Sequence, residues 1–226
     1  MSRSRLTTAL AALCAAAAVY AAVTTVAVWG GPGTCEGQPV TVTTNNNGAP
    51  IGNGNDAIDG TGDADVIAGL GGNDEIFGGG ANDLICAGSG NDDVGGDGGN
   101  DRVLGEDGND SVGVSDTGAG DDSLDGGDGR DATYGGVGDD TVRGGPGDDT
   151  SPAGFAGTGQ RRIVGGAGDD KLKGGSGNDR LNGNSGKDDI FGEQGKDKMD
   201  GGSARDSCSG GSGRDRATDC ERVSGV

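Results

Sequence analysis

Histidine is absent from this chain of 226 residues, and aromatic side chains are scarce: three Phe, two Tyr and one Trp. Without imidazole there is no nitrogen ligand for a typical zinc site and no histidine base for catalysis. So few aromatic residues also leave little material for the core of a separate catalytic domain. Basic side chains are outnumbered, 17 against 37 acidic ones, and the net charge of −20 argues against binding to nucleic acid.

Glycine and aspartate are abundant instead, and they recur with a fixed period. Glycine contributes 54 residues, and from residue 56 to residue 215 an aspartate recurs at nearly every ninth position. Two steps of the series measure twelve residues, and one of its eighteen positions holds Arg161. A period of this kind is typical of repeat architectures. The aspartates of the series, all candidate metal ligands, are Asp56, Asp65, Asp74, Asp83, Asp92, Asp101, Asp110, Asp122, Asp131, Asp140, Asp149, Asp170, Asp179, Asp188, Asp197, Asp206 and Asp215.

The repeat has the consensus G-G-x-G-x-D-x-U-x, where U is a large aliphatic residue; residues 165–172 read GGAGDDKL. The glycine half predicts a turn, because glycine tolerates positive φ and close backbone approach. The x-U-x half predicts a very short strand with one side chain facing inward and two facing outward. Two repeats then make one coil, and the chain is expected to be an all-β, right-handed parallel β-roll (a β-solenoid) of about 18 repeats.

In such a coil, aspartates eighteen residues apart lie above one another, about 4.8 Å apart. A column of carboxylates repels itself unless cations lie between the coils. Calcium prefers six to eight oxygen ligands, which carboxylates and bare glycine carbonyls would supply. The inward side chains alone offset too little of the ordering entropy of a glycine-rich chain, so multiple Ca²⁺ ions are expected to drive folding.

The repeats resemble the RTX (repeats-in-toxin), or haemolysin-type, calcium-binding nonapeptides, over about residues 51–217. This resemblance implies a calcium-bound parallel β-roll, with ions held between alternate repeats by the aspartates named above and by glycine-loop carbonyls. Many members of that family carry a C-terminal export signal, whereas this chain has an N-terminal one. It therefore looks like a small relative exported by the general secretory route.

The repeat series departs from its pattern in three ways. Three extra residues fall near residues 113–117 and again near residues 152–155, and we interpret both as outward loops that interrupt ion sharing without ending the coil. Arg161 removes one carboxylate, so the site shared with Asp179 is expected to be empty or filled by the guanidinium. Thr133 and Ser151 at inward positions predict a softer core around residues 130–160.

The two ends of the chain lie outside the repeats. Residues 1–27 have a basic start, an apolar run and a small-residue cleavage site near Ala27, with Ala21 as an alternative, which is typical of a signal peptide. The run is long enough that an uncleaved membrane anchor is the alternative. Residues 28–50 form a leader or N-terminal cap, and residues 218–226 a C-terminal cap. The expected location is extracellular, or cell-surface if the segment stays as an anchor.

Cysteine usage agrees with an oxidising compartment. Leaving out Cys14 in the apolar segment, four cysteines remain, which allow three pairings. Proximity in sequence favours Cys35–Cys86, which would tie the leader to the repeats, and Cys208–Cys220, which would close the last coil. Solenoids need capped ends, and this pairing would supply them.

Three classes of function compete for such a chain. A calcium-folded structural or interaction module is the leading hypothesis, with no catalytic residues predicted. An enzyme is the second, and the absence of histidine and the scarcity of aromatic residues argue against it. A surface-binding protein is the alternative, in which basic residues of the C-terminal third contact an anionic cell-surface polymer; they are Arg161, Arg162, Lys171, Lys173, Arg180, Lys196 and Lys198. Ice binding would need regular outward ranks of Thr or Asn, and the outward positions are mixed. The rod is expected to be a monomer.

Overall fold

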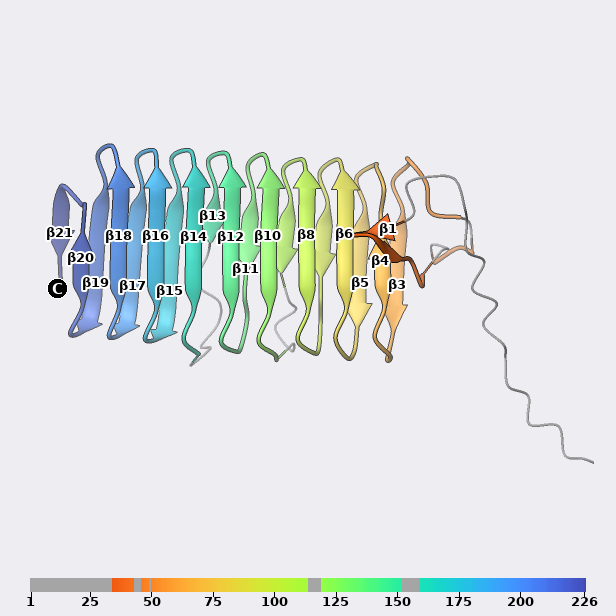
Figure 1. Cartoon of the computed structure of the whole chain (residues 1–226), viewed down its shortest axis with the longest axis horizontal. Coiled ribbons are helices and arrows are strands. Elements are labelled where there is room, and N and C mark those ends of the chain that lie inside the picture. The colour runs from red at the N-terminus through yellow and green to blue at the C-terminus, as the bar shows by residue number, and fades with distance from the viewer. Residues whose placement is uncertain (1–33, 43–45, 49, 114–118, 152–158) are drawn as a thin grey trace, which may run out of the picture.

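The computed structural model describes residues 34–42, 46–48, 50–113, 119–151 and 159–226. These residues form a rod in which two long parallel sheets face each other, and the chain crosses from one sheet to the other at every turn (Figure 1). The described residues contain strands and turns and no helix. The predicted all-β parallel β-solenoid is therefore confirmed.

The first sheet has nine strands, which pair in the order β20-β18-β16-β14-β12-β10-β8-β6-β4. Every neighbouring pair is parallel and two strands apart in sequence, as a coil of two repeats requires. The strands are β4 (Val66–Ala68), β6 (Leu84–Ser89), β8 (Arg102–Asp107), β10 (Ser123–Asp128), β12 (Thr141–Pro146), β14 (Arg162–Ala167), β16 (Arg180–Ser185), β18 (Lys198–Ser203) and β20 (Arg216–Thr218).

The second sheet has ten strands, in the order β21-β19-β17-β15-β13-β11-β9-β7-β5-β3. It faces the first sheet along the whole rod (Figure 1). Its strands are β3 (Ala57–Thr61), β5 (Glu75–Gly79), β7 (Asp93–Gly95), β9 (Ser111–Gly113), β11 (Ala132–Tyr134), β13 (Thr150–Ser151), β15 (Lys171–Gly177), β17 (Asp189–Gly195), β19 (Ser207–Gly213) and β21 (Arg222–Ser224).

The aliphatic side chain of each repeat forms the core between the sheets. Where the residue two positions after the aspartate is a large aliphatic one, its side chain faces inward and is at most 2% exposed. Thr133 and Cys208 are equally buried at the equivalent positions. The inward aliphatic residues are Ile58, Ile67, Ile76, Ile85, Val94, Val103, Val112, Leu124, Val142, Ile163, Leu172, Leu181, Ile190 and Met199.

Most strands of the two long sheets are longer than the three residues that the consensus predicts. In the first sheet, β8 runs through Gly105 into the residues assigned to the turn. Gly105 is buried, and a β-carbon there would lie 2.2 Å from the carbonyl oxygen of Gly126 in the next coil. The first glycine of the motif is therefore a strand residue that permits close packing, and the sharp turn is made further on, where Gly108 has a φ of 154°.

The two twelve-residue steps leave the stacking of the coils intact. The extra residues lie outside the described residues, but the strands on either side pair in normal register, Arg102 with Ser123 and Thr141 with Arg162. The carboxylate at the foot of each coil also keeps its contact with the coil before it, as described below. The prediction that these steps do not end the coil is therefore confirmed, and the interruption of ion sharing stays a prediction.

Both ends of the rod carry a disulfide bond. Cys35 pairs with Cys86, and this bond joins β6 to the short antiparallel pair of β1 (Thr34–Cys35) and β2 (Gln38–Pro39). Cys208 pairs with Cys220, which holds β19 to the segment before β21. The favoured pairing is thus confirmed, and it is the feature that ties the ends.

The predicted signal segment, residues 1–27, lies outside the described residues. Within the part of the chain that the structure does describe, no helix is long and apolar enough to cross a membrane.

Candidate metal centre

The repeated aspartates form two columns, one along each edge of the rod, because each aspartate directly precedes a strand. The parallel pairing places residues 18 or 21 apart on top of one another. The first column precedes strands of the first sheet and contains Asp65, Asp83, Asp101, Asp122, Asp140, Arg161, Asp179, Asp197 and Asp215. The second column precedes strands of the second sheet and contains Asp56, Asp74, Asp92, Asp110, Asp131, Asp149, Asp170, Asp188 and Asp206.

One oxygen of each stacked carboxylate is used to join coils. The Oδ1 atom accepts a hydrogen bond from the backbone N–H of the aspartate one coil earlier, at 2.8 Å for Asp74 N–H to Asp92 Oδ1. The same bond spans the longer steps, at 2.9 Å from the N–H of Asp101 to Asp122 and at 2.8 Å from that of Asp149 to Asp170. The carboxylates thus belong to the backbone hydrogen-bond system of the solenoid.

The other oxygen, Oδ2, is buried and has no hydrogen-bond partner in fifteen of the seventeen aspartates. In thirteen of these aspartates it faces a small space beside a glycine five residues earlier, which a β-carbon would fill. Ala87 occupies the equivalent position before Asp92, and the residue five before Asp122 lies outside the described residues. A β-carbon on Gly78 would lie 2.6 Å from Asp83 Oδ2 and 2.8 Å from the carbonyl oxygen of Gly96, one coil further. A carboxylate oxygen and a carbonyl oxygen from successive coils therefore converge on one position.

Burial raises the pKa of many of these carboxylates, because it removes the water that stabilises their charged form. Loss of hydration raises the pKa of Asp110, Asp122 and Asp170 to about 7, although each accepts a backbone hydrogen bond that works in the opposite direction. Further aspartates of the columns, which repel one another, contribute to the increase. The same causes raise the pKa of a second set to about 6, namely Asp83, Asp149, Asp188 and Asp197.

The first aspartate of each column has a different environment. Asp65 Oδ2 accepts hydrogen bonds from the N–H and hydroxyl of Thr61, at 2.7 and 2.8 Å, and its Oδ1 accepts one from Thr41. Asp56 Oδ2 accepts one from the N–H of Gly52 at 3.0 Å. Protein donors thus satisfy the carboxylates of the first coil, and both residues are weaker candidate ligands than the other fifteen.

The donor set fits a hard divalent cation. Unpartnered carboxylate oxygens that are more than nine-tenths buried need a positive charge, and the neighbouring glycine carbonyls provide neutral oxygen ligands. Within the described ranges, no group of three or more acidic or cysteine side chains surrounds a single point. Any ion would therefore depend on backbone carbonyls as well as on the aspartates, which suits calcium better than zinc.

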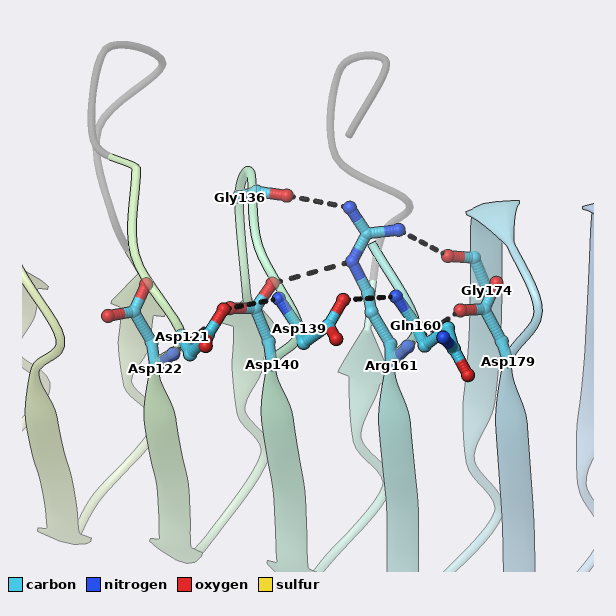
Figure 2. Close-up of polar contacts among 9 residues, drawn as sticks. All are labelled: Asp121, Asp122, Gly136, Asp139, Asp140, Gln160, Arg161, Gly174 and Asp179. Carbon is cyan, nitrogen blue, oxygen red and sulfur yellow. Dashed lines mark hydrogen bonds and ion pairs between the residues drawn. The ribbon is translucent and has the colours of Figure 1, made fainter. Parts of the chain in front are cut away.

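Arg161 occupies the only position of the first column that lacks a carboxylate, and its side chain is 4% exposed (Figure 2). Its guanidinium donates hydrogen bonds to the carbonyl oxygens of Gly136 and Gly174, at 2.6 and 2.7 Å. Its Nε atom lies 3.5 Å from Asp140 Oδ2 in an ion pair. Of the two outcomes expected from the sequence, an empty site or one filled by the guanidinium, the structure shows the second.

A second ladder on the outside of each edge was not expected from the sequence. The residue before each aspartate is often Asn or Asp, and its side-chain oxygen accepts a hydrogen bond from the N–H one coil later. Asn91 N–H donates to Asn73, and Asn100 N–H donates to Asn82, at 2.9 and 2.8 Å. The recurring Asn-Asp pair is the signal that would have predicted it. The outer ladder runs in the opposite direction to the inner one.

A parallel β-solenoid with a column of buried aspartates at each edge defines the class of calcium β-rolls. The chain belongs to the family of RTX calcium-binding nonapeptide repeats, whose model matches residues 51–85, 59–94, 87–112, 116–150, 157–190 and 182–217. These segments cover almost all of the coils.

No curated protein matches the chain. Among solved structures it is similar to a hyperactive, Ca²⁺-dependent, β-helical antifreeze protein from an Antarctic bacterium, with 17% identity and a TM-score of 0.35. The match covers 77% of this chain and 78% of that one. A similarity this low supports no inference about function.

Proposed function

We propose that this protein is an extracellular, non-enzymatic calcium-binding β-roll, which folds when Ca²⁺ ions bind along its two aspartate columns. The observation that carries the proposal is the set of fifteen buried Oδ2 atoms without a hydrogen-bond partner. Of these fifteen, Asp140 Oδ2 has an ion pair with Arg161. Leaving the other anionic oxygens unpaired costs free energy in the coils that contain them, and a cation between coils removes that cost. Calcium would supply the positive charge, and the aspartates and glycine carbonyls would hold it.

A calcium titration of the purified protein, followed by far-UV circular dichroism, tests this proposal. We expect a disordered spectrum in metal-free buffer at pH 7.5 that becomes a β spectrum between micromolar and millimolar calcium. Magnesium is the control, because it keeps its own water ligands and demands a stricter geometry. A protein that is fully folded without metal, or that responds equally to magnesium, would contradict the proposal.

Export rests on the N-terminal segment. Basic residues followed by an apolar run and a small-residue site support a signal peptide that is cleaved after Ala27, and the disulfides agree with an oxidising compartment. N-terminal sequencing of the protein recovered from the culture medium is expected to begin at Val28. Recovery of the intact chain from the membrane fraction would support the anchored alternative instead.

A second candidate function, binding of an anionic cell-surface polysaccharide, is favoured by one surface feature. Arg162, Arg180, Lys198 and Arg216 pair in register on neighbouring strands and are all exposed on the first sheet. Adjacent parallel strands place such residues about 4.8 Å apart, which forms a rank of four cations along the rod. The basic residues expected from the sequence do not all share it, because Arg161 is buried.

Chromatography on immobilised heparin, used as the anionic polysaccharide probe, tests this candidate. The double variant Arg180→Glu and Lys198→Glu is expected to elute at a lower salt concentration than the unmodified protein. Lys171→Glu with Lys173→Glu is the matched control, because these lysines lie in β15 of the second sheet. Equal elution of the two variants would exclude a role for the rank.

A further inference from the structure

Arg161 interrupts the series of carboxylates in the first column, although the backbone at this position would also accommodate an aspartate. The step from Asp140 to Arg161 is 21 residues, and the step from Asp149 to Asp170 on the opposite edge has the same length. The second step keeps its hydrogen bond from N–H to carboxylate at 2.8 Å. A carboxylate at position 161 would therefore fit the coil, and the arginine is a difference of side chain and not of backbone.

The guanidinium of Arg161 takes up the oxygen atoms that elsewhere lie beside an unpartnered carboxylate. At Asp83 the oxygen that shares the space is the carbonyl of Gly96, thirteen residues later. For position 161 the residue thirteen later is Gly174, whose carbonyl accepts a hydrogen bond from Arg161 Nη1 at 2.7 Å. The Gly136 carbonyl and Asp140 Oδ2 of the preceding coil complete the set (Figure 2).

We propose that Arg161 is a built-in cation, which replaces bound metal at this point and divides the first column into two separate groups of ion sites. The inference rests on the proposed calcium binding. The N-terminal group extends to Asp140, and the C-terminal group begins at Asp179. A guanidinium stays protonated at all ordinary pH values and cannot dissociate from the chain. The coils next to Arg161 therefore have a permanent positive charge between their oxygen atoms. The other coils obtain that charge only when calcium binds.

Replacing the arginine by aspartate converts the position into the ordinary repeat. In Arg161→Asp, the new carboxylate can accept a hydrogen bond from the N–H of Asp140, and its second oxygen faces the carbonyl of Gly174. The variant is expected to bind at least one calcium ion more than the unmodified protein. Arg162→Asp is the matched control, since it makes the same change of charge at the next residue on an exposed side chain. We expect it to leave the number of ions unchanged.

Native mass spectrometry of the full chain in saturating calcium counts the ions directly. A folded Arg161→Asp protein with the same number of ions as the unmodified chain would overturn the inference, and so would an equal gain in Arg162→Asp. If the unmodified chain bound no calcium, the proposed function itself would fail. The two failures are therefore distinguishable.

Hydrogen exchange of the unmodified protein provides a second measurement that does not require a folded variant. As free calcium is lowered, amides of β14 and β16 beside Arg161 are expected to lose protection at a lower calcium concentration than those of β8 and β10 in the same sheet. Loss at the same or a higher concentration would contradict a built-in cation. In Arg161→Gln, which retains polar contacts without the charge, the difference between the two pairs of strands should disappear.

Discussion

At the scale of single residues, the two oxygens of the repeated aspartates beyond the first coil have separate roles. Oδ1 accepts a backbone hydrogen bond from the preceding coil, whereas Oδ2 is buried without a hydrogen-bond partner. An isosteric amide would preserve the first role and abolish the second. The aspartates are therefore both structural acceptors and candidate ligands, and substitutions can separate the two.

Asp110→Asn is expected to have opposite effects on the metal-free and the calcium-bound protein. The amide oxygen can still accept the N–H of Asp92, and the buried charge disappears, so the metal-free form should gain about 1 kcal/mol. The calcium midpoint should rise severalfold, because one ligand charge is lost. Calcium titrations measure the midpoint, and far-UV circular dichroism in metal-free buffer with a stabilising osmolyte measures the folded fraction of the metal-free form. The exposed Asp107→Asn is the control, and a fall in metal-free stability of Asp110→Asn would contradict the separation of roles.

The metal-free protein is expected to become less stable as the pH rises from 5 to 8. Burial raises the pKa of Asp110, Asp122 and Asp170 to about 7, above the usual value of an unfolded aspartate. Each of these carboxyl groups binds its proton more tightly in the folded than in the unfolded chain, so protonation stabilises the folded state. This stabilisation is complete below the pKa of the unfolded chain and is lost as the pH rises through about 7. Far-UV circular dichroism of the metal-free protein between pH 5 and pH 8 measures it, since the β signal reports the folded fraction. A larger β signal at pH 8 than at pH 5 would refute the expectation.

At the scale of the structural element, each repeat is a strand and a turn that share a run of glycines. Gly105 lies in β8 and faces the core, where a β-carbon would lie 2.6 Å from Asp110 Oδ2 as well as close to the next coil. The strand and the candidate ion site therefore use the same free volume. This explains why a residue that weakens ordinary strands occurs inside these.

Gly105→Ala is expected to cost about 1–3 kcal/mol of folding free energy in saturating calcium, because the added methyl group overlaps backbone that cannot move independently. Gly80→Ala is the matched control, since a β-carbon there would have its nearest neighbour at 3.7 Å. Denaturant unfolding measures both. Equal stability of the two variants would show that the inward glycines are not constrained by packing.

Much at this scale could be predicted from the sequence, for reasons that particular residues make clear. The nine-residue period predicted that Asp83 lies above Asp65 and that Ile85 lies in the core, because in a parallel stack the spacing in sequence determines the position in space. The continuation of the coil across the twelve-residue steps was predictable as well, because the nine-residue pattern resumes after each of them. Gly174 holds the repeat position next to Arg161 that Gly96 holds next to Asp83, but the contact of the guanidinium with Gly136 in the preceding coil could not be predicted, since it depends on the length of the arginine side chain.

At the scale of the whole molecule, the rod is one-dimensional: each coil contacts its neighbours, and only the end coils have an open side. The two disulfides include Cys35 of β1 and Cys208 of β19, strands that lie at opposite ends of the rod (Figure 1). Charge is also distributed along the rod, with 4 basic and 23 acidic residues up to residue 140 and 13 and 14 after it. Calcium is therefore expected to matter most for the N-terminal half.

Removing the C-terminal disulfide is expected to loosen that end alone. In Cys208→Ser with Cys220→Ser, amides of β19 and β21 should lose up to about 3 kcal/mol of protection, because the bond restricts the unfolded end segment. Amides of β8 and β10 should keep theirs. Hydrogen exchange in saturating calcium measures both regions, and a uniform loss along the rod would contradict the one-dimensional description.

At the last coil, a glutamate takes the hydrogen-bond acceptor position that an aspartate of the next coil would hold. The N–H of Asp206 donates to Glu221 Oε2 at 2.6 Å, where every earlier coil of the second column receives an aspartate. A glutamate from the chain's own tail thus occupies the acceptor position that the first coil of another molecule would have to supply. In the language of polymer chemistry, Glu221 is a chain terminator: it closes the growing end of a template that could otherwise add units without limit, and it favours separate rods over fibres.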